Sequence, residues 1–309
     1  MDVKIWRMFK RSEWYIAVLL LMFSGASWAS TYTLYIKSGN WVVNGSGGAT
    51  IKVWGFTDAP TAGPIVPGPL LESQEGESVT ITVYNQHTLP HNFVVRGITT
   101  DQTQIPAGGN RTYVFTTSTA GVYLFSDTIN SINREMGLYG AFVVHAAGGI
   151  NKAWTNGPSF DIERLWVVSD MDKSRWNDIA GAGGTVNTSV YKPNYFMMNG
   201  MGGFDAMRAP NTVLQGNVGQ VGLVRIVNAG QFDESLHFHA NHFQIIDADG
   251  ARLSSYEPGD TINVKAGTTA MLLYKFYRLG NYPMHVHTAQ METANGVYLN
   301  GAATLIVGQ

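Results

Sequence analysis

The sequence predicts an all-β protein with two tandem domains of the Greek-key sandwich or barrel type. Short runs rich in β-branched and aromatic residues recur along the chain, and Gly, Asn, Asp and Pro separate them. No stretch after the N-terminal segment keeps a convincing helical period. Many short strands joined by glycine-rich turns favour a sandwich or barrel. The runs expected to form strands are Val79–Tyr84, Thr112–Thr116, Gly140–His145, Leu223–Val227, Phe243–Ala248 and Thr269–Phe276.

The domain boundaries follow from length and from one breaker-rich segment. A chain of 309 residues suits one large or two medium domains, at about 100–200 residues each. Residues 146–159 combine Gly, Asn and Pro with little periodicity, as is typical of a linker. We therefore expect a signal peptide over residues 1–29, a first domain over 30–147, a linker over 148–159 and a second domain over 160–309. The nearest helical candidate, Thr128–Met136, is short and polar.

The two halves contain a similar strand. Gly76–Asn85 begins with glycine, continues as an alternating strand and ends in Asn, and His87 and His91 follow it. Gly219–Asn228 has the same form, and histidines follow it too. This similarity indicates one strand-and-loop plan used twice, and the alternative is a chance likeness between two β domains.

Composition removes several classes of function. The chain has no cysteine, which excludes disulfides, thiolate zinc sites, iron–sulfur clusters, cysteine nucleophiles and thiolate-bound blue copper. Any metal must be held by His, Met or carboxylate ligands. The net charge of −2 lacks the basic excess that nucleic-acid binding needs, so we expect no nucleic-acid partner.

The N-terminus predicts export. Basic residues precede an uncharged run, Trp14–Phe23, and Ser27 and Ala29 are small residues at the positions that a signal peptidase inspects. We expect a periplasmic or secreted protein. An uncleaved anchor is the alternative, although the run is shorter than the roughly 20 residues that a spanning helix needs.

The histidines carry the strongest chemical signal. Two His-x-His pairs, His237 with His239 and His285 with His287, lie in the second half of the chain. Residues two apart in a strand point to the same face, so each pair can offer two imidazoles to one side of a sheet. Neither pair contains a thiolate or carboxylate, which favours copper or zinc. The alternative is two unrelated pairs on the surface.

At these residues the sequence resembles the multicopper oxidases, in particular their two-domain members with the cupredoxin fold, and more distantly the copper nitrite reductases. The resemblance covers nearly all of the chain after residue 29. Its most specific parts are His237–His239 and Met284–His287, which resemble the family's His-x-His and His-Cys-His motifs. In that family these histidines help hold a trinuclear copper cluster that reduces dioxygen to water. The other matching segments are Val66–Pro69, Glu75–Glu77, Gly137–Ala141 and Glu163–Asp170.

The sequence departs from the family pattern at the blue copper site. The cysteine between the two histidines is Val286 here, and the histidine three places before the first pair is Glu234. The downstream histidine and methionine positions fall on Met291 and Gly296. The resemblance therefore implies that the second domain has no electron-entry copper.

The first domain also lacks the family's ligands. Its expected His-x-His pairs correspond to Val94–Gly97 and Ser126–Thr128, which contain no histidine. Aligned with the nitrite reductases, His91 matches a blue copper histidine, but the cysteine falls on Asp127 and the catalytic-copper histidines on Arg96 and Ser126. Neither alignment gives a complete site in this domain.

The predicted copper ligands are the four histidines of the two pairs, His237, His239, His285 and His287. Three further histidines are possible ligands. His242 is placed to join the site or to orient it, or else to pack at its rim. The resemblance implies a homotrimer in which the cluster lies between the first domain of one subunit and the second domain of the next. His87 and His91 would then approach the site across that interface, or else serve only the first domain. Proton relays suggested by position in the motifs are Glu234, Glu292 and Asp127.

A second cluster, Met197, Met198 and Met201 with Met207 nearby, offers thioethers suited to Cu(I). Core packing before an Asn-Gly turn is the favoured interpretation of these methionines. His145, at the end of an expected strand, is interpreted as structural. No serine lies in a nucleophile-elbow pattern.

Three functional hypotheses follow. The first is an exported copper protein that oxidises a substrate with dioxygen, taking electrons from a small-molecule reductant or another electron donor. The second is a non-catalytic copper carrier, chaperone or accessory module that uses the same histidines. The third is a metal-free cupredoxin scaffold for assembly. Fold alone does not choose among them.

Overall fold

The computed structural model describes residues 29–239, 241–256 and 258–309. The predicted signal peptide lies outside these ranges except for Ala29. No helix in the described part of the chain is long and apolar enough to cross a membrane.

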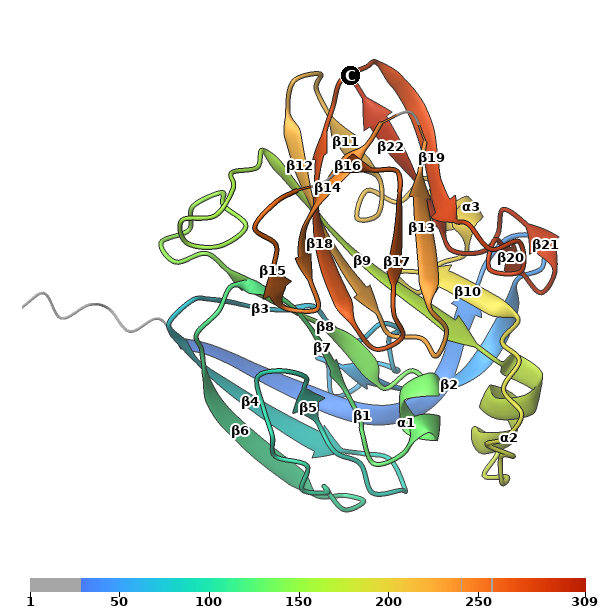
Figure 1. Cartoon of the computed structure of the whole chain (residues 1–309). Coiled ribbons are helices and arrows are strands. Elements are labelled where there is room, and N and C mark those ends of the chain that lie inside the picture. The colour runs from blue at the N-terminus through green and yellow to red at the C-terminus, as the bar shows by residue number, and fades with distance from the viewer. Residues whose placement is uncertain (1–28, 240, 257) are drawn as a thin grey trace, which may run out of the picture.

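Strands β1 to β8 form two packed sheets, drawn in blue and green in Figure 1. We call this part the first domain. Apolar residues of both sheets, such as Ile36, Val83 and Phe142, form one buried cluster between them. One sheet has the order β2 (Ala49–Thr57), β1 (Ala29–Val43), β4 (Glu77–Asn85) and β6 (Asn110–Thr117). The other has the order β3 (Leu71–Gln74), β8 (Tyr139–His145), β7 (Gly121–Ser126) and β5 (Val94–Val95).

Strands β9 to β22 form two further sheets, which we call the second domain (Figure 1). The larger sheet contains β15 (Ala251–Arg252), β14 (Phe243–Ala248), β18 (Thr269–Lys275), β12 (Val221–Asn228), β9 (Ile162–Met171), β10 (Tyr195–Met198), β20 (Thr293–Ala294) and β21 (Val297–Tyr298), with β16 (Pro258–Gly259) on β14. The smaller sheet has the order β11 (Leu214–Gly216), β22 (Ala303–Gly308), β19 (Gly280–Val286), β13 (Glu234–Phe238) and β17 (Thr261–Val264).

The all-β prediction is confirmed, and every predicted run coincides with a strand, apart from Phe276, which directly follows β18. The helical candidate contains α1 (Ser131–Glu135), whose start is capped by the Asn130 side chain. Three short helices were not predicted, because each is only a turn or so long and has no amphipathic period. They are η1 (Lys173–Asn177), α2 (Asp178–Ala180) and α3 (Gly203–Ala206). The exact domain boundaries at residues 147 and 160 stay predictions.

The repeated strand occupies the same place in both domains. In the first domain, β4 pairs in parallel with β1 and antiparallel with β6. In the second domain, β12 pairs in parallel with β9 and antiparallel with β18. The resemblance between Gly76–Asn85 and Gly219–Asn228 therefore reflects an equivalent strand.

The asparagine that ends each of these strands also makes the same hydrogen bonds. The Asn85 amide donates to the carbonyls of Leu89 (2.8 Å) and Ile105 (2.9 Å). The Asn228 amide donates to the carbonyls of Phe232 (2.8 Å) and Val264 (2.9 Å). We call this arrangement the asparagine latch.

Each latch also accepts one bond from the backbone. The side-chain oxygens of Asn85 and Asn228 accept from the N–H two residues later, at 3.0 Å in both domains. Six residues after each latch stands a buried polar residue, His91 in the first domain and Glu234 in the second. These two residues are therefore equivalent.

Removing a latch is expected to destabilise the protein. Asn228 is fully buried, and Asn228→Ala would remove the partner of the buried Val264 carbonyl, of the buried Gly230 N–H and of the partly buried Phe232 carbonyl. At about 1–3 kcal/mol per unsatisfied buried group, we expect the free energy of unfolding to fall by about 3 kcal/mol or more. Urea unfolding followed by circular dichroism measures this. Asn217→Ala, at an exposed position, is the control, and an equally small effect of both variants would contradict the latch.

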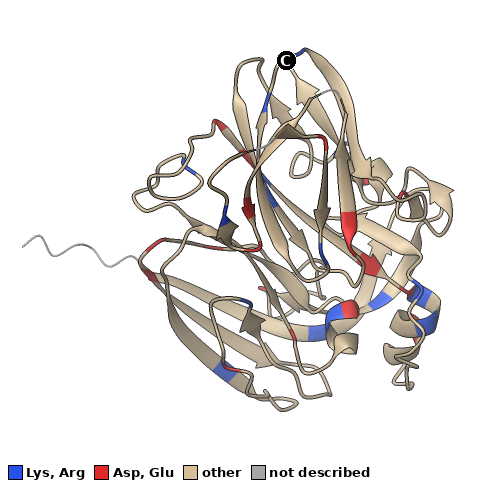
Figure 2. Cartoon of the chain, viewed as in Figure 1, with Lys and Arg blue, Asp and Glu red and all other residues tan. Residues whose placement is uncertain are grey.

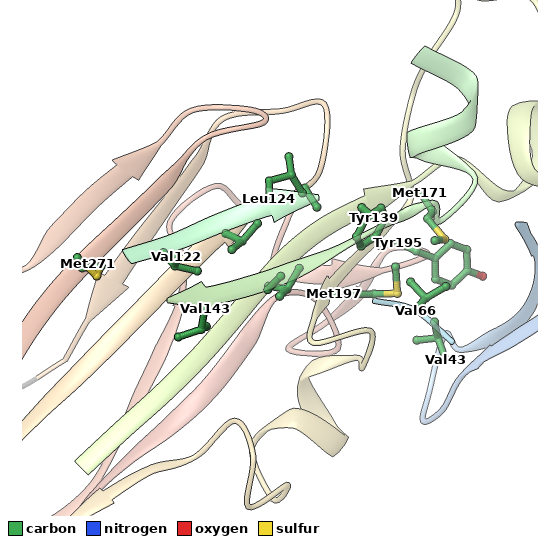
Figure 3. Close-up of a cluster of buried hydrophobic side chains, with 14 of the residues drawn as sticks. Val43, Val66, Val122, Leu124, Tyr139, Val143, Met171, Tyr195, Met197 and Met271 are labelled. Atoms are coloured by element: carbon green, nitrogen blue, oxygen red, sulfur yellow. The ribbon is translucent and has the colours of Figure 1, made fainter. Parts of the chain in front are cut away.

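An apolar cluster with residues of both domains joins them (Figure 3). Val66 and Val143 of the first domain belong to the same buried cluster as Met171 and Met197 of the second. Hydrogen bonds add to it, since the Trp41 indole donates to the carbonyl of Gly200 at 2.7 Å. Charged residues are sparse on the strands (Figure 2), in keeping with the 14% charged composition. Apolar packing, side-chain hydrogen bonds and the ion pair between Arg96 and Asp249 therefore hold the domains together.

Candidate metal centre

The two His-x-His pairs lie on neighbouring antiparallel strands of the smaller sheet. On β13, Leu236 and Phe238 are buried, so His237 and His239 point to the opposite face. On β19, Met284 and Val286 are buried in the same way, which turns His285 and His287 outward. The pairing sets His237 directly opposite His285. The alternation predicted from the sequence therefore brings the four imidazoles together on the outer face of this sheet.

The four rings form one compact cluster. The Nε2 atoms of His239 and His285 are 3.0 Å apart. The ring centroid of His237 lies 4.9 Å from that of His239, 5.8 Å from that of His285 and 5.0 Å from that of His287. We call these four residues the histidine cluster. His287 is exposed and the other three are half-buried, so the cluster is open to solvent on one side.

Neighbouring polar groups orient two of the rings. The Nδ1 of His237 lies 2.9 Å from the hydroxyl of Thr261 on β17. The Nδ1 of His285 lies 3.0 Å from a carboxylate oxygen of Glu292. Metal-binding histidines commonly use one ring nitrogen for such a partner and the other for the metal. Neither contact uses Nε2, which in His285 faces the Nε2 of His239.

The surroundings of His239 favour a neutral imidazole. Burial, and then the nearby rings of His285, His237 and His287, lower the pKa of His239 below its ordinary value. A neutral imidazole offers a lone pair for metal coordination, whereas a protonated one does not. The environment of His239 thus keeps its ring in the form that binds a metal.

The donor set fits copper, and the rings must still adjust to bind it. Two imidazole nitrogens bound to one ion at about 2.0–2.1 Å each lie roughly 2.9–3.4 Å apart, and the His239–His285 separation of 3.0 Å falls within this range. Within the described residues, however, no three His, Asp or Glu side chains already surround a single point. The rings of His237 and His287 would therefore have to turn toward those of His239 and His285 to bind the same ion.

The inner face of β13 and β19 corresponds to the position of the missing blue copper site. Val286 packs there against Phe196, Met291 and Ala302, an apolar cluster without a coordinating group other than the Met291 thioether. Glu234 is fully buried, and neither of its carboxylate oxygens has a hydrogen-bond partner in the described structure. Burial, with the nearby carboxylates of Asp170 and Asp233, holds the pKa of Glu234 well above its ordinary value.

Glu234 is expected to lower stability. Its carboxyl group is desolvated without compensation, at a cost of about 1–3 kcal/mol for an unsatisfied buried polar group. Replacing it with leucine should therefore raise the free energy of unfolding by an amount of that order, measured by urea unfolding at pH 7. Glu234→Gln keeps a polar group and is the matched control. A loss of stability in Glu234→Leu would show that the carboxyl group has a partner.

His87 and His91 lie in a different site. His87 Nδ1 is 2.8 Å from His91 Nε2, and His91 Nδ1 is 2.7 Å from a carboxylate oxygen of Asp127. All three side chains are buried, and the Trp54 ring lies tilted beside His87 with the ring centroids 4.8 Å apart. Burial, with the neighbouring His91, lowers the pKa of His87 to about 4. The structure thus joins these residues in a hydrogen-bonded chain inside the first domain and does not bring them to the histidine cluster of the same chain.

Most of the remaining predicted site residues do not contact the histidine cluster. Of the three proposed proton relays, only Glu292 contacts the histidine cluster, because Glu234 lies on the inner face of β13 and Asp127 in the first domain. His242 is exposed. Sequence reasoning missed Thr261, which follows only from its pairing with His237 across β13 and β17.

Two of the four clustered methionines pack in the core. Met197 and Met198 are fully buried in β10, as the packing interpretation predicted. Met201 and Met207 are half-buried. His145 lies 3.0 Å from a carboxylate oxygen of Glu72 at the end of β8.

A sequence model described as multicopper oxidase matches residues 166–307, and a second with the same description matches residues 57–148. The chain belongs to the multicopper oxidase family. This family and the structural neighbours described next are copper proteins. No protein of curated function matches the sequence significantly.

The similar solved structures agree with this family. The blue copper oxidase from Nitrosomonas europaea has a TM-score of 0.76 and 22% identity, over 91% of this chain and 86% of that chain. The multicopper oxidase mgLAC has a TM-score of 0.75 and 22% identity, over 91% of this chain and 86% of that chain. The copper nitrite reductase from Nitrosomonas europaea has a TM-score of 0.72 and 20% identity, over 91% of this chain and 94% of that chain. At these identities the likeness establishes the cupredoxin-like fold.

Proposed function

We propose that this protein is an exported copper-binding member of the multicopper oxidase family that holds copper at the histidine cluster. The observation that carries the proposal is the convergence of four imidazoles, His237, His239, His285 and His287, on one face of neighbouring strands. The absence of cysteine excludes a thiolate blue copper centre anywhere in the chain. Export is supported by the basic and apolar pattern of residues 1–29.

The surrounding residues would prepare the cluster for this role. Thr261 fixes the ring of His237, and Glu292 fixes the ring of His285 and can hold a proton at its Nδ1. Bound copper would supply reversible one-electron chemistry and a binding position for dioxygen or another small oxidant. The exposed side of the cluster at His287 gives such a molecule access.

Electrons would have to arrive from outside the chain. The inner-face position that the family uses for electron entry holds Val286, and Glu234 is buried on the same face of the sheet. Neither residue carries electrons. We therefore propose that a small-molecule reductant, or another electron donor, reaches the exposed face of the cluster.

The outward position of the cluster also supports a homotrimer. The histidines point away from the core of their own domain, so another subunit can pack beside them. The family resemblance places the first domain of a neighbouring subunit there. Groups of that subunit or water would complete the coordination.

A second candidate function is copper carriage or delivery without turnover. The observation that favours it is the loss of the electron-entry position at Val286. An open cluster of imidazoles suits transfer of an ion to a partner protein. Oxygen consumption distinguishes the two functions, because only the oxidase consumes oxygen with a reductant.

Copper content tests the proposal. The protein is loaded with copper, dialysed and measured for copper per chain, with its electron paramagnetic resonance spectrum. We expect at least one retained ion with a nitrogen-rich, non-blue Cu(II) signal, or a coupled silent pair. Oxygen uptake with a phenolic reductant would then support the oxidase, and its absence the carrier. A chain that retains no copper would contradict both and favour the scaffold.

A further inference from the structure

A cavity of about 560 Å³ lies between the two domains. Its apolar walls include Val66 and Val143 of the first domain, both drawn in Figure 3, and Leu165 and Val167 of the second. Cavities of about 300–1,000 Å³ at domain interfaces, with apolar walls and a few polar groups, are typical sites for small molecules. None of the four clustered histidines lines this cavity.

An aromatic side chain gives the cavity a flat wall. The Trp41 indole N–H is already used by the carbonyl of Gly200. The ring therefore offers the cavity apolar surface rather than a free donor. A flat apolar molecule would pack against this surface, since aromatic rings favour stacked or edge contacts.

One cation at the cavity has unused donors. Arg225 is fully buried, and its Nε donates to a carboxylate oxygen of Glu163. Its Nη1 contacts only the Met271 sulfur, at 3.0 Å, and its Nη2 has no partner in the described structure. A guanidinium carries five N–H donors. A buried donor without a partner is costly, so an acceptor from a bound molecule would improve this site.

The other charged groups allow that acceptor to be an anion. Arg164 also lines the cavity and donates to the carbonyls of Val213 and Glu163, which leaves its charge unneutralised by these contacts. His145 stands between the carboxylates of Glu72 (3.0 Å) and Glu163 (3.8 Å). The two guanidinium groups at the cavity balance the two carboxylates, Glu72 and Glu163, and Arg225 keeps a donor without a partner in the described structure. Carboxylates are the groups that guanidinium donors bind best.

We propose that this cavity binds a small aromatic carboxylate, with its ring against Trp41 and its carboxylate toward Arg225. The site is built from both domains, so its occupant would bridge them. The proposal does not depend on copper, because the cavity and the histidine cluster involve different sheets of the second domain.

Benzoate is the probe, and benzamide is its neutral control. The metal-free full chain is titrated with each by calorimetry, so that carboxylate binding to copper does not contribute. We expect saturable benzoate binding at one site per chain and at least about tenfold weaker binding of benzamide, a difference of about 1.4 kcal/mol. Equal binding of the two probes, or no benzoate binding by the folded chain, would overturn the proposal.

Two variants locate the site without touching Arg225, whose loss would endanger folding. Leu165→Trp fills the cavity and should weaken benzoate binding at least about tenfold. Val218→Trp, at a position that is 48% exposed and outside the cavity, is its control. Glu72→Gln removes a negative charge at a side chain that is 53% exposed and should strengthen binding. Unchanged affinity in Leu165→Trp would place benzoate elsewhere and refute the assignment.

Discussion

Replacing His285 and His287 together with alanine is expected to remove most copper binding while the fold stays intact. The two residues supply half of the imidazoles, and His285 makes the closest contact in the cluster, at 3.0 Å to His239. Both side chains point out of the sheet, so their removal leaves the buried Met284 and Val286 in place. Copper retained after dialysis, measured by atomic absorption, should fall from one or more ions per chain to well below one.

His145→Ala is the matched control for this experiment, since it removes a half-buried histidine at the end of β8, outside the cluster. It should keep the copper content of the unmodified chain. Circular dichroism and thermal unfolding establish that both proteins are folded. Unchanged copper content in the folded double variant would refute the site assignment.

Stability is expected to decrease as pH rises from about 4.5 to about 8. Burial and the nearby carboxylate of Asp170 raise the pKa of Glu135 from 4.5 to about 8. The unfolded chain loses this proton near pH 4.5, whereas the folded chain keeps it until about pH 8. The stabilisation is therefore complete below pH 4.5 and is lost progressively toward pH 8. At 1.36 kcal/mol per pKa unit, the loss from this group is on the order of 4 kcal/mol.

Contacts with Arg134 and Tyr191 lower the pKa of Glu135, but they do not outweigh burial and the Asp170 carboxylate. Arg134 lies 3.0 Å from the Glu135 carboxylate, and the Tyr191 hydroxyl, at 3.3 Å, also donates to Asp170 at 2.5 Å. Burial raises the pKa of Asp170 too, which adds to the same trend. The pH dependence of stability is measured as the free energy of unfolding in urea between pH 4.5 and 8.5. Glu135→Gln should flatten the profile, and an unchanged slope in that variant would assign the pH dependence to other groups.

Local pattern was enough to predict much of the fold and the histidine cluster. Strand alternation alone places His237 and His239 on one face, and neighbouring strands then bring His285 and His287 beside them. The long strand β1 was missed, although it pairs with both β2 and β4. Its polar and glycine-containing second half, Lys37–Asn40, resembles a turn when its partners are unknown.

Contacts between distant segments could not be predicted. Glu135, Asp170 and Tyr191 come from three separate parts of the chain, and only the packing of the domains brings them together. The cavity between the domains has the same origin, because its wall at Trp41 and its cation at Arg225 lie far apart in sequence. No periodicity in a single strand carries information about such pairs.

The asparagine latch has a consequence for how the two domains could diverge by mutation. Asn85 and Asn228 hold their loops through backbone groups alone, so the loop keeps its path whatever side chain stands six residues later. That position can therefore carry side chains of different chemistry in the two domains. The first domain has His91 there, within a hydrogen-bonded chain, and the second has Glu234, whose carboxylate has no partner in the described structure. The latch would thus let the loop accept substitution at this position.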